Sequence, residues 1–301
     1  MEPGSQTPAR PPYLSLIIDA HKIQASPLFP PGTTNMTRRF FLAALALVAF
    51  SLPSFAADKP VRVLIITGDH GHAWKETTPY LKEVLTKAGM TVDVTETPSK
   101  DLTADNLGKY DVLLLNYKDT KKGSAESVWS DANKKAFTDA VKSGKGLVVY
   151  HHASSAFVGG DDFSKEFEKI IAGGWRKQGN HGKRHEFSLT VRKEHPITKG
   201  LPADLPHSND ELYANSVMLP EAETLVTAFS DKKIDPKNTD KHEPVVWVAS
   251  YGKGRVVENV LGHDVAAMKG SAAFRALLVR GVEWAATGEV KSPAPSDVKG
   301  K

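Results

Sequence analysis

The sequence predicts an α/β fold in which helices flank a doubly wound, mostly parallel sheet. Three observations support this prediction. Short apolar runs of strand length recur along the chain, amphipathic segments of helix length separate them, and glycines mark many of the boundaries. Strands that alternate with helices in this way form parallel sheets with right-handed connections.

The first half of the chain shows this alternation most clearly. Its apolar runs have the length of buried strands, and its amphipathic segments end at glycines. Ser130 is a favourable N-cap for the second helix. The expected strands are 61–68, 90–97, 110–117 and 146–150, and the expected helices are 76–89 and 130–144.

The second half is less regular. The first helix expected after residue 157 is 164–173, and a glycine-rich stretch follows it. A turn-rich connection covers 195–202. The last two strands are joined by a tight turn that contains glycine. The expected helices are 164–173 and 271–288, and the expected strands are 186–193, 224–230, 244–254 and 255–263.

Residues 1–56 are predicted to be an N-terminal extension with an export signal. Arg38 and Arg39 precede an apolar run at 40–50, and small residues follow it up to Ala56. This run is shorter than the roughly 20 residues that span a bilayer. The pattern resembles a twin-arginine signal, with an ordinary secretory signal as the alternative, and Met36 is a candidate start.

The signal predicts a bacterial protein that is periplasmic or secreted, with the twin-arginine export machinery as a partner and no membrane attachment after cleavage. Residues 57–288 then form the folded domain. The tail, 289–301, is rich in proline and lysine and is predicted to be disordered.

Charge and cysteine content exclude several functions. The net charge is +4, and removing residues 1–56 takes away four basic and two acidic residues, which leaves +2. Such a weak charge argues against a nucleic-acid partner. The chain has no cysteine, so it can form neither a disulfide nor a thiol nucleophile.

Histidines gather at the ends of the predicted strands. His70 and His72 follow the first strand, His151 and His152 follow the fourth, and His263 ends a later one. Parallel strands end at one edge of a sheet, which is where ligands bind in open α/β folds. We therefore expect these imidazoles to converge, with neighbouring positive charges depressing the pKa of each histidine.

Two other segments supply polar groups to the same predicted site. His181 and His185 lie in or near the glycine-rich stretch, and Asp210 and Glu211 follow His207. Imidazole and carboxylate groups suit acid/base catalysis, and they also bind zinc, manganese or iron. A divalent metal ion is therefore an open alternative, with four candidate ligands: His72, His151, His181 and His263.

Nine short motifs, in order, resemble the ThuA-like (trehalose utilisation) family over about residues 61–288. They are HAW (72–74), GKGLVVYHHA (144–153), GGW (173–175), HGKRHEF (181–187), HPITKGLP (195–202), DELY (210–213), EPVVW (243–247), YGKGRV (251–256) and LGH (261–263). The resemblance implies a flavodoxin-like fold related to the class I glutamine amidotransferases. Those enzymes carry a nucleophilic cysteine where this chain has His151 or His152, so glutaminase chemistry is excluded.

The resemblance also implies carbohydrate metabolism through 3-keto sugars, with a small carbohydrate as the ligand. The candidate catalytic residues are His151, His263, Asp210 and Glu211. The candidate substrate-binding residues are His72, Trp74, His181, His185, Tyr213 and Trp175. Three readings stay open: a hydrolase or lyase of 3-keto-glycosides, a non-catalytic carbohydrate-binding module, and a metal-dependent hydrolase of another small molecule.

Overall fold

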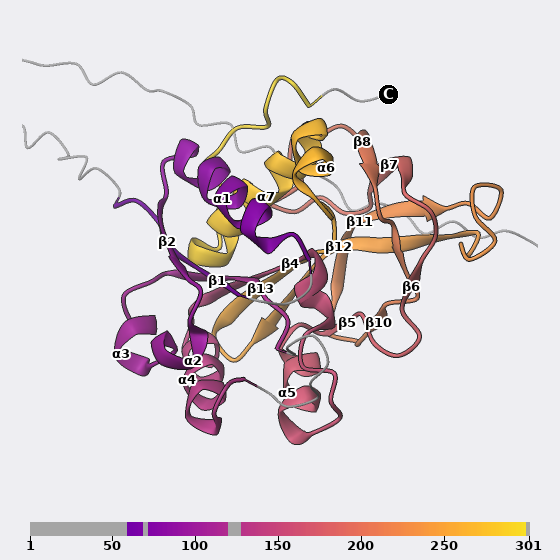
Figure 1. Cartoon of the computed structure of the whole chain (residues 1–301). Coiled ribbons are helices and arrows are strands. Elements are labelled where there is room, and N and C mark those ends of the chain that lie inside the picture. Colours follow the sequence, from indigo (N-terminus) through magenta and orange to yellow (C-terminus); the bar gives the residue numbers. More distant parts are fainter. Residues whose placement is uncertain (1–58, 69–71, 120–127, 299–301) are drawn as a thin grey trace, which may run out of the picture. The chain divides into compact units, whose positions relative to one another are not determined.

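The computed structural model describes residues 59–68, 72–119 and 128–298, and these form an α/β fold (Figure 1). The predicted export signal lies outside the described residues. A nine-stranded sheet runs in the order β2-β1-β3-β4-β13-β12-β11-β7-β8. None of the helices in the described ranges is long and apolar enough to cross a membrane.

The first half of the sheet is parallel. Strands β1, β3 and β4 are buried along almost their whole length because helices cover both faces, which explains their continuous apolar sequences. These five strands pair in parallel, as the sequence predicts: β2 (Thr91–Thr95), β1 (Arg62–Thr67), β3 (Val112–Asn116), β4 (Gly146–Tyr150) and β13 (Gly254–Asn259).

The second half of the sheet is antiparallel. The predicted tight turn joins β12 to β13, and three further strands extend the sheet by antiparallel pairing. The strands are β12 (Lys241–Tyr251), β11 (Glu223–Ser230), β7 (His185–Val191) and β8 (Asp204–Asp210). Two short pairs lie beside this sheet: β5 (Gly173–Gly174) with β10 (Val217–Met218), and β6 (Asn180–His181) with β9 (Tyr213–Ala214).

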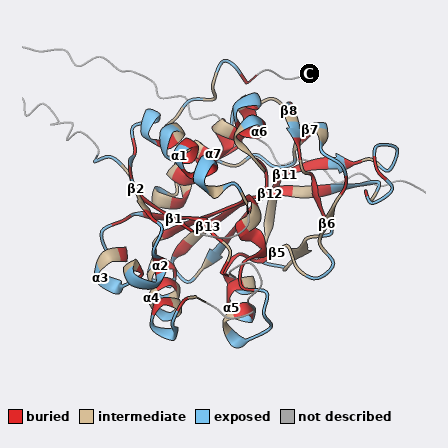
Figure 2. Cartoon of the chain, in the orientation of Figure 1, coloured by how far each residue is buried: buried red, intermediate tan, exposed pale blue. Residues whose placement is uncertain are grey.

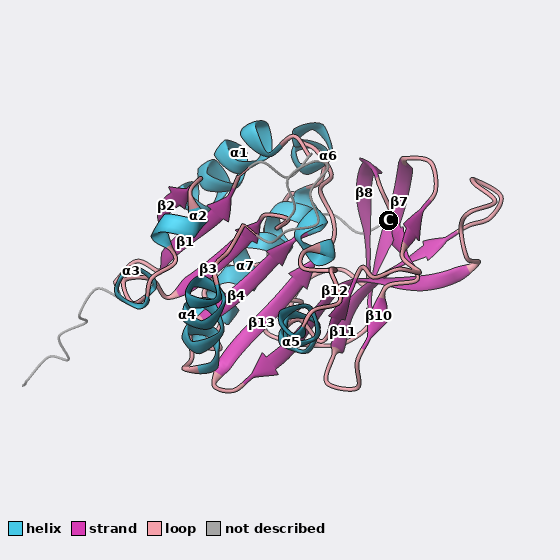
Figure 3. Ribbon diagram, turned by 60° about the horizontal axis from the view of Figure 1, so that its bottom comes forward, coloured by secondary structure: helices cyan, strands magenta, loops and turns pink. Residues whose placement is uncertain are grey.

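Helices cover both faces of the parallel half, which creates two apolar cores (Figures 2 and 3). One face carries α1 (Trp74–Lys87), α6 (Val265–Gly270) and α7 (Ala272–Thr287). The other face carries α2 (Pro98–Asp101), α3 (Ala104–Leu107), α4 (Asp131–Lys142) and α5 (Asp162–Ile170). The doubly wound arrangement predicted from the sequence is therefore confirmed.

Local sequence explains where the helices begin and how closely they pack. Ser130 caps α4 as expected, and it forms a reciprocal capping box with Asn133. Gly146 lets α7 approach β4, since a Cβ at that position would lie 2.6 Å from the Ala285 backbone. In the predicted tail, Ser292 hydrogen-bonds to Glu283 of α7 and Val298 is buried, so residues 289–298 lie against this helix.

Candidate functional site

Three strand ends deliver histidines to the carboxyl edge of the parallel half. β4 ends at Tyr150, and His151 then takes a left-handed conformation with φ of 45° at the start of a short 3-10 helix (His151–Ser155). A positive φ is uncommon for a residue other than glycine, and such residues often occur at functional sites. His72 follows β1, and His263 follows β13.

The three imidazole rings are neighbours in the structure. The ring centroids are 5.4 Å apart for His72 and His151, 4.9 Å for His72 and His263, and 5.3 Å for His151 and His263. The convergence expected from the parallel strand ends is thus present. His152, the second histidine of the adjacent pair, stacks on the ring of His72 at 3.7 Å.

Glu211 lies at the centre of this histidine cluster. Its Oε2 is 3.0 Å from Nδ1 of His263 and 3.7 Å from Nε2 of His151. Its other oxygen, Oε1, is 3.8 Å from Nε2 of His181. One carboxylate therefore links histidines from three separate loops.

The hydrogen bonds of His151 fix its tautomer. Its Nδ1 is 2.8 Å from the Val260 carbonyl oxygen, and a carbonyl only accepts, so Nδ1 carries the proton. The lone pair of Nε2 then faces Nδ1 of His263 at 3.2 Å and accepts from the Tyr213 hydroxyl at 3.1 Å. Burial lowers the pKa of His151, whose side chain is 1 % exposed, so its ring is neutral at pH 7.

His263 behaves in the opposite way. The hydrogen bond to Glu211 raises the pKa of His263 above its ordinary value, despite partial burial. Burial acts to raise the pKa of Glu211, but the hydrogen bond from His263 and the nearby imidazoles bring it below its usual value. The expectation that clustering depresses the pKa of every histidine is therefore wrong for His263, because a carboxylate sits among the rings.

Asp210 is a buried clamp behind the cluster. Its carboxylate accepts hydrogen bonds from the backbone N–H groups of Gly262 at 2.6 Å and His263 at 2.9 Å. It also accepts from Nε2 of His207 at 2.7 Å and from the Glu211 N–H at 2.9 Å. Burial opposes ionisation, yet the hydrogen bond and charge of His207 hold the pKa of Asp210 well below its usual range. Because Asp210 is fully buried, we assign it a positioning role.

Gly262 makes this clamp sterically feasible. Its φ is 89°, and a Cβ there would lie 2.8 Å from the Phe274 ring. Any side chain would therefore displace the loop that carries His263.

Aromatic side chains form one wall of the site. The Trp175 and Tyr213 rings meet edge to face with their centroids 4.4 Å apart. The His181 ring lies nearly parallel to that of Tyr213, with the centroids 6.3 Å apart. The pairing of β6 with β9 places His181 directly opposite Tyr213. Trp175 and His181 are only partly buried, so this wall faces solvent.

Other histidines and Trp74 lie outside these contacts. His185 hydrogen-bonds through Nδ1 to the Lys183 carbonyl and packs on Phe187. Trp74 starts α1 and contacts Lys75. His195 holds its turn by accepting from the Ile197 N–H. His70 lies outside the described residues.

Two groups that support the site were not predicted from the sequence. Ser271 caps α7 and also contacts Nδ1 of His207 at 2.8 Å, which connects the helix to the Asp210 clamp. Arg184 donates to Asp264 at 2.7 Å beside His263. The serine before the closing helix was a detectable capping signal, but its contact with His207 depends on tertiary structure.

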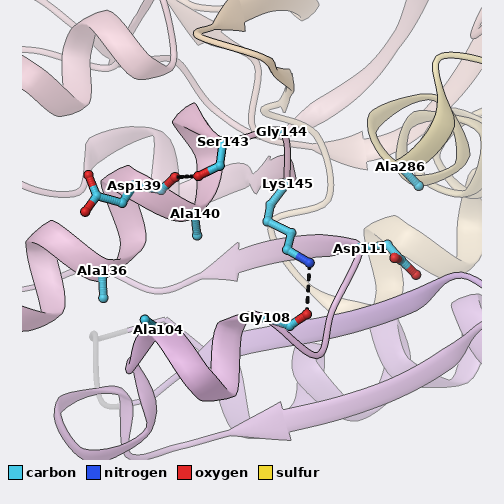
Figure 4. Close-up of a pocket in the computed structure, with 10 residues that line it drawn as sticks. All are labelled: Ala104, Gly108, Asp111, Ala136, Asp139, Ala140, Ser143, Gly144, Lys145 and Ala286. Carbon is cyan, nitrogen blue, oxygen red and sulfur yellow. Dashed lines mark hydrogen bonds between the residues drawn. The ribbon is translucent and has the colours of Figure 1, made fainter.

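A separate cavity of about 450 Å³ lies at the opposite, amino-terminal edge of β3 and β4 (Figure 4). Its lining comes from the loops before these strands and from α3, α4 and α7. Lys145 points across it and donates to the Gly108 carbonyl at 3.0 Å. Its ionisable groups, Asp111, Asp139 and Lys145, lie apart in this view, so the cavity has no counterpart to the histidine cluster.

Comparisons with known proteins agree with this architecture. A ThuA-like protein from Parabacteroides merdae has 31% identity and a TM-score of 0.68, covering 80% of this chain and 95% of its own. A ThuA-like protein from Bacteroides uniformis has 21% identity and a TM-score of 0.60, covering 79% and 98%. A cytoplasmic protein from Salmonella typhimurium, at 13% identity and TM-score 0.54, covers 75% and 100% and shares the fold.

No curated protein sequence matches the chain significantly. The profile of the ThuA family, described as trehalose utilisation, matches residues 62–285, which include every described residue of the histidine cluster. The chain therefore belongs to the ThuA family, related to carbohydrate metabolism.

Proposed function

We propose that this chain acts on a sugar or a 3-keto-glycoside, with imidazole and carboxylate groups at the carboxyl edge of the sheet transferring protons. Membership of the ThuA family supports the substrate class. The observation that carries the proposal is the three-way contact of His151, His263 and Glu211, at 3.0–3.7 Å, where parallel strands end.

The chemistry needs three functions from the protein. A keto group at C3 of a sugar acidifies the C–H at C2, so a base removes that proton and an enolate forms. The C1–O bond then breaks, and the departing alcohol takes a proton from an acid. The site must therefore hold a base, an acid and a group that stabilises the enolate oxygen.

The structure suggests how these functions are divided. The side chain of His263 is 27 % exposed and so is accessible to a substrate, whereas His151 is buried and its Nε2 faces Nδ1 of His263 and the Tyr213 hydroxyl. His263 exchanges the proton with the sugar, and His151 and Glu211 stabilise its two protonation states. His72 and His181 polarise the carbonyl, and Asp210 fixes the backbone of His263.

The aromatic wall suits a sugar ring. Trp175 is partly exposed beside His181 and is backed by the buried Tyr213 ring, and aromatic faces pack on the apolar faces of sugars. The same wall favours the second candidate function, a carbohydrate-binding module without catalysis. The two functions differ in outcome, since an enzyme consumes its ligand over time and a binding module only saturates.

Export is a further part of the proposal. Its support is the arginine pair and apolar run within residues 36–56, which lie outside the described residues. Fractionation of cells that express the full chain tests this, with Arg38→Lys and Arg39→Lys together as the variant. Twin-arginine export predicts retention of this double variant in the cytoplasm. Unchanged export would instead support an ordinary secretory signal.

A substrate time course tests the catalytic proposal. Residues 57–301 are incubated with 3-keto-trehalose and, in parallel, with trehalose, and both sugars are followed by NMR. The expected result is steady loss of the keto sugar, abolished by His263→Ala and retained by His242→Ala, a histidine on β12 that contacts Thr227. Saturable binding of the sugar without its consumption would contradict the catalytic proposal and support a carbohydrate-binding module.

A further inference from the structure

The histidine cluster has the donor atoms of a metal centre. One ligand atom from each of His72, His151, Glu211 and His263 lies within 4.8 Å of the other three. His72 and His263 are half-buried, and the side chains of His151 and Glu211 are less exposed than that of His263.

The distances among three of these ligand atoms, those of His151, His263 and Glu211, are close to the edges of a coordination tetrahedron. Zinc–nitrogen bonds of about 2.0–2.1 Å at tetrahedral angles place two ligand atoms about 3.3 Å apart. The observed separations are 3.2 Å between His151 Nε2 and His263 Nδ1, 3.0 Å between His263 Nδ1 and Glu211 Oε2, and 3.7 Å between His151 Nε2 and Glu211 Oε2. Small side-chain rotations are therefore enough to bring these atoms around one ion.

Groups behind the donors hold them in ligating orientations. The bond from His151 Nδ1 to the Val260 carbonyl leaves Nε2 as the ligand atom, which is the arrangement usual for histidines that bind metals. Asp210 accepts from the N–H groups of both Glu211 and His263, so one buried carboxylate fixes the backbone of two donors. His207 in turn fixes Asp210.

The donor types select a class of metal. Three imidazole nitrogens and one carboxylate oxygen suit Zn²⁺ and neighbouring transition metals, whereas Mg²⁺ and Ca²⁺ prefer sites built from oxygen. With neutral rings and an ionised Glu211, the donors carry one negative charge. A bound divalent ion would leave a net positive centre.

We propose that His72, His151, Glu211 and His263 bind one divalent transition-metal ion, with Zn²⁺ as the first candidate. This inference deepens the proposed function, on which its catalytic meaning rests. A bound ion would take the lone pair of His151 and a ring nitrogen of His263, so it would replace the proton transfer assigned to His263. It would serve as the electrophile by accepting a sugar oxygen as a fifth ligand. His181, 3.8 Å from the other oxygen of Glu211, would then be the available basic side chain.

Metal binding is measured without any sugar, so its outcome is separate from that of the time course. Untagged residues 57–301 are treated with a chelator and dialysed against Zn²⁺ or Mg²⁺, and bound metal is measured by mass spectrometry. We expect one equivalent of Zn²⁺, no retained Mg²⁺ and a higher melting temperature with Zn²⁺. A chain that retains no stoichiometric Zn²⁺ would overturn the metal centre.

Variants test whether the bound ion occupies this set of donors. Loss of an outer-shell partner weakens metal sites 10- to 100-fold, so removing a direct ligand by Glu211→Gln or His263→Ala should weaken Zn²⁺ binding at least about 100-fold. Glu211→Gln keeps the side-chain shape, which guards against a folding failure, and circular dichroism checks both variants. His242→Ala is the matched control and should bind as the wild type does. Wild-type affinity in both site variants would refute the proposed ligands.

Metal and sugar results combine into distinct outcomes. Turnover of the keto sugar by a chain that binds no metal would support proton transfer by histidines and refute the metal centre. Stoichiometric Zn²⁺ binding without any turnover would support the metal centre and refute the catalytic proposal.

Discussion

The two edges of the parallel sheet carry loops of very different character. The amino-terminal edge holds the roughly 450 Å³ cavity, where Lys145 is satisfied by a backbone carbonyl and Asp111 accepts from the Arg62 N–H (Figure 4). The carboxyl edge holds fully and partly buried imidazoles and carboxylates close to one another. The candidate site is therefore marked by its clustered ionisable groups, and the described residues that line the cavity at the amino-terminal edge form no such cluster.

The largest expected effect is a loss of turnover caused by substitutions at the carboxyl edge, with no loss from a substitution at the amino-terminal edge. Removing a group that transfers a proton costs about 100- to 10,000-fold in rate, so His263→Ala should reduce turnover of a 3-keto-glycoside by that order. Glu211→Gln removes the charge that stabilises protonated His263 and should also reduce turnover. Lys145→Ala is the matched change at the amino-terminal edge and should leave turnover unchanged. Steady-state kinetics on the three variants makes the comparison, and a fall in the Lys145 variant equal to the others would reverse the assignment of the two edges.

A second prediction concerns the clamp behind the site. Asp210→Ala leaves the buried donors of His207, Gly262 and His263 without an acceptor, and each costs about 1–3 kcal/mol, so it should lower the free energy of unfolding by about 3 kcal/mol or more. Asp210→Asn keeps the shape and should cost less. Urea unfolding of both variants measures this. Equal, small losses in the two variants would show that the contacts to His207 and Gly262 contribute little.

The smallest effect separates helix capping from support of the site. Ser271 and Ser130 are both N-caps, of α7 and α4, and removing either side chain should cost about 1 kcal/mol in stability. Only Ser271 also contacts His207, so Ser271→Ala alone should lower turnover. If the Ser130→Ala variant loses activity to the same degree, the contact with His207 has no special role.

Much of the fold follows from local sequence because the parallel strands are continuous apolar runs. β8 was missed, since Pro206 and three aspartate or asparagine residues give it little strand propensity. It forms nonetheless at the edge of the sheet, where proline is tolerated. Asp210 ends this strand, which pairs with β7, and its contacts with Gly262 and His263 in the loop after β13 were not predictable from composition.

The histidines of the site were predictable, but their electrostatics were not. Strand ends alone indicated that His72, His151 and His263 converge. The pKa of His151 falls because its ring is buried, whereas the pKa of His263 rises because it hydrogen-bonds to Glu211. The burial of His151 and the contact of His263 with Glu211 both depend on segments distant in sequence, so they appear only in the folded structure.

The central claim, proton transfer at the carboxyl edge, is tested most directly by isotope loss. A 3-keto-glycoside deuterated at C2 is incubated with the protein in water, and deuterium released from that carbon is followed by NMR. We predict release well above the rate without protein, lost in His263→Ala and Glu211→Gln and kept in Lys145→Ala. No release by the wild type, or release that the His263 and Glu211 variants retain, would contradict the claim.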